Sequence, residues 1–371
     1  METASLARLY AVEGPFVTIY LATPSDVPNA AQQHELRWQN LLRDLEERGV
    51  DRATREALTA AVGGHEPGGQ RVLVAAHGRV LLATSLPEQP AQEVTVSVSA
   101  LPALLPLVES LSLRVPHLVV RVDRVGADID AYAGVEEPVE SAEVKGDEWP
   151  IRKVGPGGWS QRRYQARAEE SWERNAKEVA GTVAKVAADV GARLVVATGD
   201  VRALTLVADN LPEHVKPLWT TVEGGRSADG SEALVAARVL DKLGELARRD
   251  TLQLLETFAE ERGQGDRASD GAADTVAALR MAQVDTLLLT DQIDASRTAE
   301  FGPQPTQLGL TADDLHAMGV EHPQQAPLPD VLLRAALGTD AAVRLVPGDV
   351  DASPREGLGA LLRFATPRTS G

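Results

Sequence analysis

The chain has 371 residues, and none of them is cysteine. This absence excludes disulfide bonds, metal sites with thiolate ligands and cysteine nucleophiles. The chain also lacks any run of the roughly 18 apolar residues that a helix needs to cross a bilayer. Its N-terminus, Met1–Ser5, lacks the basic and then apolar segments of an export signal. We therefore expect a soluble cytoplasmic protein with no membrane partner.

The chain also has no excess of basic residues, since its formal net charge is -17. Such a chain is not suited to bind DNA or other nucleic acid over its whole surface, since neutralising phosphates requires clustered Lys and Arg. Exposed charges more than about 8 Å away are nevertheless largely screened at physiological salt. A single basic segment can therefore still contact RNA.

Metal-ligating patterns are sparse. His34 with Glu35, His65 and His77 were the candidates, but no pair has the spacing of four that places two imidazoles on one helix face. No third ligand lies nearby in the sequence. We expect no metal and no other cofactor.

Apolar patterns typical of strands and helices alternate along the chain, which indicates a mixed α/β fold. In the first part they predict a strand at 16–21, helices at 34–48 and 52–62, a hairpin of 71–76 with 79–83 that turns at His77-Gly78, and a helix or linking segment at 101–113. In the middle they predict strands at 117–123 and 126–132, an acidic loop or edge hairpin at 136–148, a long helix ending near 190, a strand at 193–198 and a helix at 201–210.

The last part repeats these patterns. They predict a helix at 232–261, a helix capped by Asp270, a strand at 284–289, a polar excursion at 291–325, a helix at 328–337, a strand at 342–346 and a third strand at 361–364. Because the chain is longer than one core usually organises, we expect three domains, each a small sheet with packed helices. Their predicted limits are 1–115, 116–230 and 231–371.

Residues 151–167, the basic segment, reverse the sign of the chain's charge. They include five basic residues and no acidic one: Arg152, Lys153, Arg162, Arg163 and Arg167. Within the segment lies Gly155-Pro156-Gly157-Gly158, where the absence of Cβ atoms lets a ligand approach the backbone closely. A predicted helix follows at once, and free N–H groups at a helix start favour phosphate. Trp159 can stack on a base.

Known phosphate-binding loops do not match the basic segment. The Gly-Lys-Ser/Thr ending of a Walker loop is missing, and no apolar strand directly precedes the glycines as in a dinucleotide fingerprint. The plainer interpretation is a flexible loop followed by a solvated basic helix start. The combination of glycines, an aromatic residue and arginines without any acid favours a binding function.

Together, the Gly-Gly loop, the run Ser160-Gln161-Arg162-Arg163-Tyr164 and the long helix resemble the central domain of a known family. This family comprises the archaeal and eukaryotic class I release factors and their relative Pelota. The resemblance extends over essentially the whole chain. It is closest to the bacterial branch, which includes mycobacterial homologues and the ribosome hibernation factor Balon. It implies three domains, the last resembling a ribosomal kink-turn-binding protein.

The chain departs from the family at the catalytic position. In the release factors the loop carries Gly-Gly-Gln, which positions a water at the ester in the peptidyl-transferase centre. Here Trp159 follows the two glycines, so we expect no hydrolysis of peptidyl-tRNA and no enzymatic activity. Gly68-Gly69-Gln70 spells the motif literally, but the β-rich run 71–76 follows it instead of a basic helix. We interpret it as a hairpin or strand-entry loop.

The resemblance implies a ribosome hibernation factor that occupies the A site of the 70S ribosome during stress or dormancy, together with elongation factor Tu. The first domain would face the decoding centre, and the third would contact the factor or the stalk base. Contacts to rRNA or the P-site tRNA would come from Arg152, Lys153, Gly155, Gly157, Gly158, Trp159, Ser160, Gln161, Arg162, Arg163 and Arg167.

Two alternatives of other classes stay open. One is a ribosome rescue factor or peptidyl-tRNA hydrolase of the release-factor type, in which Gln161 or Gln165 replaces the missing Gln. The other is a stress adaptor that never enters the ribosome.

Overall fold

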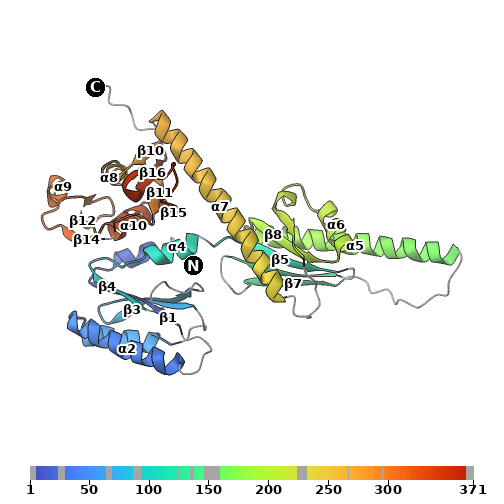
Figure 1. The fold of residues 1–371 in the computed structure, drawn as a ribbon, viewed down its shortest axis with the longest axis horizontal. Coiled ribbons are helices and arrows are strands. Elements are labelled where there is room, and N and C mark those ends of the chain that lie inside the picture. The colour runs from blue at the N-terminus through green and yellow to red at the C-terminus, as the bar shows by residue number, and fades with distance from the viewer. Residues whose placement is uncertain are drawn as a thin grey trace. The chain divides into compact units, whose positions relative to one another are not determined.

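A computed structural model describes most of the chain. At 30–31, 112, 145, 159–171 and 232–233 it describes the backbone but not the side chains. The described residues are 6–23, 30–63, 69–86, 94–112, 114–123, 126–133, 138–145, 159–223, 232–265, 267–294 and 296–364. The chain forms two compact units (Figure 1). Unit 1 comprises Met1–Ser112 with Thr251–Gly371, and unit 2 comprises Leu113–Asp250. In the described part, no helix combines the length and apolar character of a membrane span.

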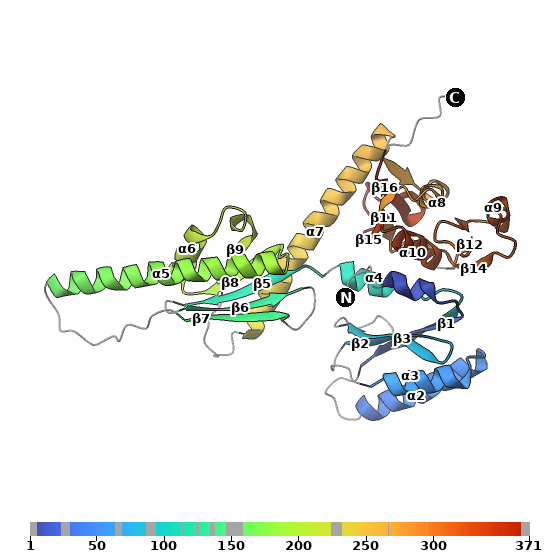
Figure 2. The same ribbon diagram turned by 180° about the vertical axis from the view of Figure 1, so that it is seen from behind.

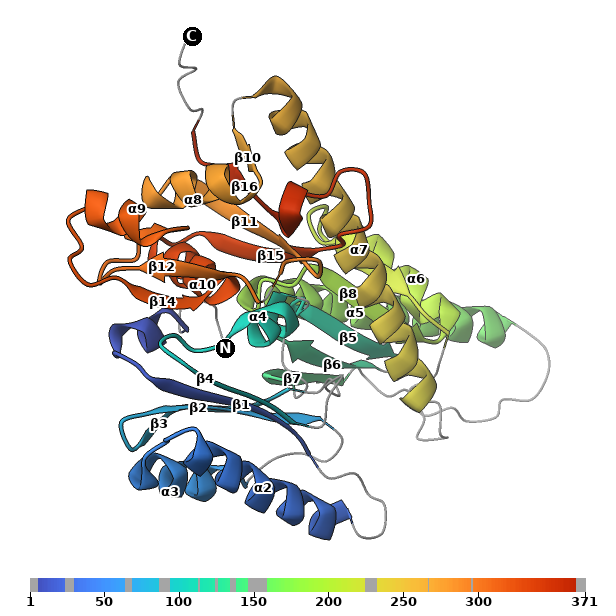
Figure 3. The same cartoon turned by 60° about the vertical axis from the view of Figure 1, so that its left-hand side comes forward.

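The first part of unit 1 is an antiparallel sheet in the order β3-β2-β1-β4. Its elements are β1 (Phe16–Ala22), β2 (Gln70–Ala76), β3 (Arg79–Leu86), β4 (Val94–Ser99), the helices α2 (Ala30–Glu47), α3 (Arg52–Ala61) and α4 (Leu105–Ser112), and the 3-10 helix η1 (Arg8–Ala11). Helices α2 and α3 cover one face of this sheet (Figure 3). The hairpin predicted at His77-Gly78 is confirmed: both residues have positive φ, 50° and 74°, as a tight hairpin turn requires.

The last part of unit 1 holds a mixed sheet in the order β10-β16-β11-β15 and a small antiparallel sheet in the order β13-β12-β14. The first is formed by β10 (Ala268–Asp270), β11 (Val284–Thr290), β15 (Ala342–Val346) and β16 (Leu358–Leu362). The second is formed by β12 (Thr298–Phe301), β13 (Leu308–Gly309) and β14 (Gln324–Pro327). The helical elements are α8 (Ala272–Arg280), α9 (Ala312–Ala317), α10 (Leu328–Gly338) and the 3-10 helix η3 (Arg355–Gly357).

Three expectations for this part were wrong. Asp270 does not cap α8: Gly271 occupies the cap position, and the Asp270 carboxylate accepts bonds from the Arg355 N–H (2.7 Å) and Nε (2.9 Å). Residues 291–325 are not a polar excursion but contain most of the small sheet, which the buried Arg334 holds by donating to the carbonyls of Gly302 and Pro303. The last strand begins at 358, earlier than predicted. Contacts between residues distant in sequence determine all three of these features, so no local sequence pattern predicts them.

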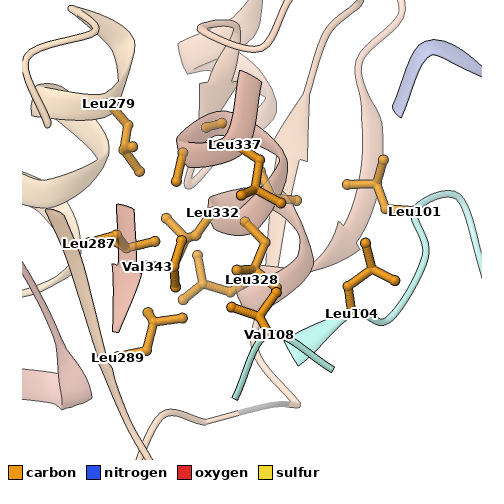
Figure 4. Packing of buried hydrophobic residues seen from close by; sticks show 14 of the residues in the cluster. Leu101, Leu104, Val108, Leu279, Leu287, Leu289, Leu328, Leu332, Leu337 and Val343 are labelled. Atoms are coloured by element: carbon orange, nitrogen blue, oxygen red, sulfur yellow. The ribbon is translucent and has the colours of Figure 1, made fainter. Parts of the chain in front are cut away.

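A common apolar core joins the two parts of unit 1. Residues of η1, β1, β2 and α4 share one buried cluster with residues of α8, α10, β11 and β15. Figure 4 shows Val108 of α4 and the preceding Leu104 among the residues of this core, with Leu328 and Leu332 of α10. The first and last segments of the chain therefore stabilise each other. The predicted limits 1–115, 116–230 and 231–371 stay a prediction.

Unit 2 contains one mixed sheet in the order β7-β6-β5-β8-β9, in which β5 pairs parallel with β8 and antiparallel with β6. Its strands are β5 (His117–Val122), β6 (Gly126–Tyr132), β7 (Glu140–Lys145), β8 (Leu194–Gly199) and β9 (Trp219–Thr221). Its helices are α5 (Trp159–Asp189), α6 (Val201–Asn210), the 3-10 helix η2 (Lys216–Leu218) and the first part of α7 (Glu232–Gln264). The predicted strands and both helices are confirmed, and the fold is mixed α/β. Of the acidic segment 136–148, residues 140–145 form the edge strand β7, and 136–137 and 146–148 lie outside the described residues.

Helix α7 contributes to both units through different residues. Val235 and Val239 pack on Val119 and Val196 of the unit 2 sheet. Further along, Leu255 and Phe258 pack on Leu288 of unit 1.

A buried carboxyl group lies in the core of unit 1. Asp330, in the first turn of α10, is only 4% exposed. Burial raises its pKa to about 7. Its negative charge acts on Tyr10 of η1 and Tyr20 of β1, and burial is the main reason that the pKa of both phenols is raised. Arg334, one turn further along α10, donates to backbone carbonyls instead of to this carboxylate.

This burial predicts a pH-dependent stability. The folded state holds the Asp330 proton more tightly than the unfolded state, so stability should fall as pH rises from about 4 to about 7 and stay level above that. The Asp330→Asn variant, which has no carboxyl proton to lose, should be more stable than the wild type at pH 8, by up to about 4 kcal/mol. The two proteins should be nearly equal at pH 4. Urea unfolding at both pH values measures the difference, and equal stabilities at pH 8 would contradict the assignment.

Candidate functional site

Helix α5 carries the second half of the basic segment. It begins at Trp159, immediately after the two glycines, and continues for 31 residues to Asp189. At a rise of 1.5 Å per residue it is about 46 Å long. The predicted long helix is therefore confirmed, together with its start directly after the Gly-Gly pair.

The later part of α5 is packed on the sheet of unit 2. The helix contacts β6, β7 and α6 through small and β-branched side chains that are buried: Ala176, Val179, Ala180, Val183, Val186 and Ala187. Their spacing of three and four residues is the stripe that the sequence predicts. Figures 1 and 2 show α5 continuing beyond the end of its sheet. We call residues 159–171, which precede the described side chains of α5, the arm.

The arm brings together part of the predicted site. The backbone of α5 places Arg163 and Arg167 one turn apart, on one side of the helix. Also in its first turns are Trp159, Ser160, Gln161 and Arg162. The remaining predicted residues lie outside the described part of the chain: Arg152, Lys153, Gly155, Gly157 and Gly158. The binding roles of both groups stay predictions.

The last two residues of the Gly68-Gly69-Gln70 sequence lie at the entry to a strand. Gly69 makes two hydrogen bonds with Thr23. The Thr23 N–H donates to the Gly69 carbonyl (2.9 Å), and the side-chain Oγ1 of Thr23 accepts from the Gly69 N–H (2.9 Å). Gln70 is buried and begins β2, paired with Ala22. The interpretation of these two residues as a strand-entry loop is confirmed, while Gly68 lies outside the described residues.

The turn between β8 and α6 is tight. Gly199 has a φ of 136°, and a Cβ atom there would lie 1.8 Å from the Val122 carbonyl oxygen. Asp200 caps α6, its Oδ1 accepting from the N–H groups of Arg202 (3.0 Å) and Ala203 (3.1 Å). Asp200 therefore serves as the N-cap of α6 in this turn.

A histidine that sequence reasoning left unassigned lies at the start of β5. The His117 ring stacks on Tyr132 with centroids 4.8 Å apart and planes 6° apart. Burial lowers the pKa of His117, which favours the neutral imidazole, and Nδ1 lies 2.8 Å from the Val115 carbonyl, so Nδ1–H is the donor. The pairing of β5 with β6 places the two rings opposite each other. This arrangement orders the start of the strand.

Metal-binding clusters of three or more His, Asp or Glu residues do not occur among the described residues. His77 Nε2 lies 2.7 Å from the carbonyl oxygen of Glu13, which explains its place at the hairpin turn. His65 lies outside the described residues.

Residues 116–264, which comprise the sheet, the arm and α7, match bacterial archaeo-eukaryotic release factor family 2. The helix that begins after the Gly-Gly pair lies within the matching region.

Two Mycobacterium tuberculosis proteins are similar over nearly their whole length. They are the uncharacterized proteins MT2704 of strain CDC 1551 / Oshkosh and Rv2629 of strain H37Rv, each 29% identical over 98% of this chain and 97% of its own.

Solved structures of release factors and Pelota also align with the chain, at low identity. The archaeal termination factor aRF1 is 18% identical over 98% of this chain and 99% of its own, with a TM-score of 0.26. Pelota of Archaeoglobus fulgidus is 14% identical over 98% and 91%, with a TM-score of 0.36. A model of ribosome-bound archaeal Pelota and ABCE1 gives 14% over 98% and 94%, with a TM-score of 0.42. Superpositions this loose do not place any residue of the chain.

Two glycines of unit 2 should respond oppositely to alanine. Gly181 lies in α5, and an added Cβ atom would meet no other atom within 4 Å, so Gly181→Ala should stabilise the protein by about 0.5–1 kcal/mol by favouring the helix. Gly199→Ala should destabilise it by at least about 3 kcal/mol through backbone strain and a clash. Urea unfolding followed by circular dichroism tests both. A harmless Gly199→Ala would mean that the turn is not as tight as described.

Proposed function

We propose that the protein binds the 70S ribosome and occupies its A site without hydrolysing peptidyl-tRNA, as a hibernation factor does. The loop at Gly157-Gly158-Trp159 would lie near the peptidyl-transferase centre. One observation carries the proposal: in a domain of the release-factor family, a long helix starts directly after a Gly-Gly pair and has basic first turns.

The chemistry of Trp159 supports binding without cleavage. A glutamine amide has both donors and an acceptor, so it can orient a water molecule, whereas the indole of Trp has a single N–H donor and no acceptor. The large ring is suited to stack on an unpaired base. With Trp159 in this place, the loop blocks the centre and supplies no group that activates water.

The distribution of charge supports the same orientation. The chain carries -17 overall, while the basic segment carries five positive charges and no negative one. Repulsion between the acidic body and rRNA is screened beyond about 8 Å, so only the groups in contact decide the binding. The arginines would contact rRNA or the acceptor end of a P-site tRNA, and elongation factor Tu would accompany the protein to the ribosome.

A paired experiment tests the proposal. Purified protein is added to vacant and to peptidyl-tRNA-loaded 70S ribosomes, and co-sedimentation and peptide release are measured together. We expect binding without release, and release should appear in the Trp159→Gln variant, which restores Gly-Gly-Gln. Release by the wild type would favour the hydrolase alternative, with Gln161 or Gln165 acting. Absence of co-sedimentation would contradict the proposal and favour an adaptor that never enters the ribosome.

Charge reversal of the arm gives a further prediction. Replacing Arg162, Arg163 and Arg167 by Glu should weaken ribosome binding and make the slope of log affinity against log salt shallower by about 2, since three phosphate contacts are lost. The melting temperature should change little, because surface substitutions rarely exceed about 0.5 kcal/mol.

The control variant has the same change in net charge. It replaces three exposed basic residues away from the arm by Glu: Lys177, Lys185 and Arg248. If the control loses as much affinity as the arm variant, general repulsion and not local contact explains the loss.

A further inference from the structure

We propose that unit 1 contains a pH-sensitive device, in which a proton on Asp330 keeps the first and last parts of the unit packed together. The first part comprises residues 6–112 and the last part residues 251–364, and the joint is the shared apolar core at which they meet. Loss of the proton would loosen the joint without unfolding either part. The inference concerns unit 1 alone and does not depend on ribosome binding.

Asp330 lies at this joint. It belongs to α10, whose residues from Leu328 to Leu337 are all buried. The helix contacts α8, β12 and β15 of the last part and α4 of the first part. The charged form of Asp330 acts electrostatically on Tyr10 of η1 and Tyr20 of β1, and both tyrosines belong to the first part. The carboxyl group of the last part is therefore buried close to the first part.

The groups around Asp330 do not compensate a negative charge. Tyr20 donates its hydroxyl to the Ala103 carbonyl (2.8 Å), and the guanidinium of Arg334 donates to three backbone carbonyls. The buried hydroxyl of Tyr10 has no hydrogen-bond partner among the described residues. An ionised Asp330 would thus be a buried charge beside a guanidinium that is already bonded elsewhere, and such a charge costs free energy.

The other ionisable residues of the elements packed around Asp330 are directed elsewhere. Those with exposed side chains are Arg8, Glu109, Asp274, Asp285 and Arg344. Glu300 accepts from the side chain of Gln325 (2.9 Å), and Arg280 pairs with Asp314 (3.1 Å). The charge within the joint therefore depends on the protonation of Asp330.

Each part of unit 1 also has a core of its own. Alternate side chains of β1 and β2 face opposite sides of their sheet: Phe16 and Val72 are in the shared core, whereas Ile19 and Leu73 are buried with residues of α2 and α3. In the last part, β11 and β15 bury further residues against α7. Separation at the joint would expose the shared core and leave these two cores buried. Such a partial opening requires less free energy than global unfolding.

The direction of the pH effect follows from where the proton is held more tightly. Burial in the closed joint raises the pKa of Asp330 to about 7, whereas an open joint returns the carboxyl group to water and to its ordinary pKa of about 4. Closure is therefore most favourable below about pH 4, weakens as the pH rises to about 7 and is constant above that. Within this window each pH unit lowers the equilibrium constant for closure about tenfold.

Hydrogen exchange of the α4 amides, followed by mass spectrometry on the full chain, measures this opening. Ala103, just before α4, is bonded to Thr18 and Tyr20 of β1, so α4 moves with the first part. A helix of eight residues is marginal once it leaves α10. Between pH 5 and pH 8 the protection factors of α4 should fall about a hundredfold. They should stay at least about tenfold below those of α3, and Asp330→Asn should abolish the fall.

A matched control separates Asp330 from the other acids of unit 1. Asp274→Asn removes an exposed carboxylate from α8 and should retain the full pH dependence of the wild type. If this control also loses the fall, or if the wild type and Asp330→Asn show the same pH dependence, Asp330 does not operate the joint. Equal protection of α4 and α3 at every pH would mean that the joint opens only when unit 1 unfolds, which would also overturn the inference.

Discussion

The packing of α5 on the sheet of unit 2 is the interaction on which the candidate site depends. Small and β-branched side chains between Ala176 and Ala187 are buried against β6, β7 and α6, while the arm extends past the sheet (Figure 2). An isolated helix of the arm's length is marginal in water. The arm is helical as an extension of a turn that the sheet already holds.

Unit 1 is organised by a different constraint, the burial of one apolar core by two distant parts of the chain. Helix α4 packs with α10 and β15, so the first sheet covers its second face with residues that follow it by more than 200 positions. Burying polar groups in this core costs free energy unless they are compensated. The buried charge of Arg334 is compensated by hydrogen bonds to the backbone carbonyls of residues 302–304. Asp330 instead avoids a buried charge by keeping its proton up to near-neutral pH.

The acidic residues that dominate the net charge and the basic segment of the candidate site lie in different parts of the sequence. Acidic residues dominate its overall composition, and the basic segment lies within the region that matches the release-factor family. The match to this family concerns the scaffold, in which a long helix starts directly after a Gly-Gly pair. The reaction depends on the next residue. A tryptophan in that place can stack and exclude water, but it lacks the acceptor with which a glutamine side chain orients water, and the proposal of a non-hydrolysing ribosome-binding protein rests on that difference.

Local patterns determined much of this protein. The hairpin at His77-Gly78, the stripe of α5 and the strands of unit 2 were all predictable, because each depends on neighbours two to four residues apart. The residue types of the basic segment were also evident. Tertiary structure alone decided the partner of Asp270, 85 residues away, the His117–Tyr132 stack and the shared core of unit 1. Each of these depends on surfaces that come together only when the chain folds, and no periodicity in the sequence records which distant residues will meet.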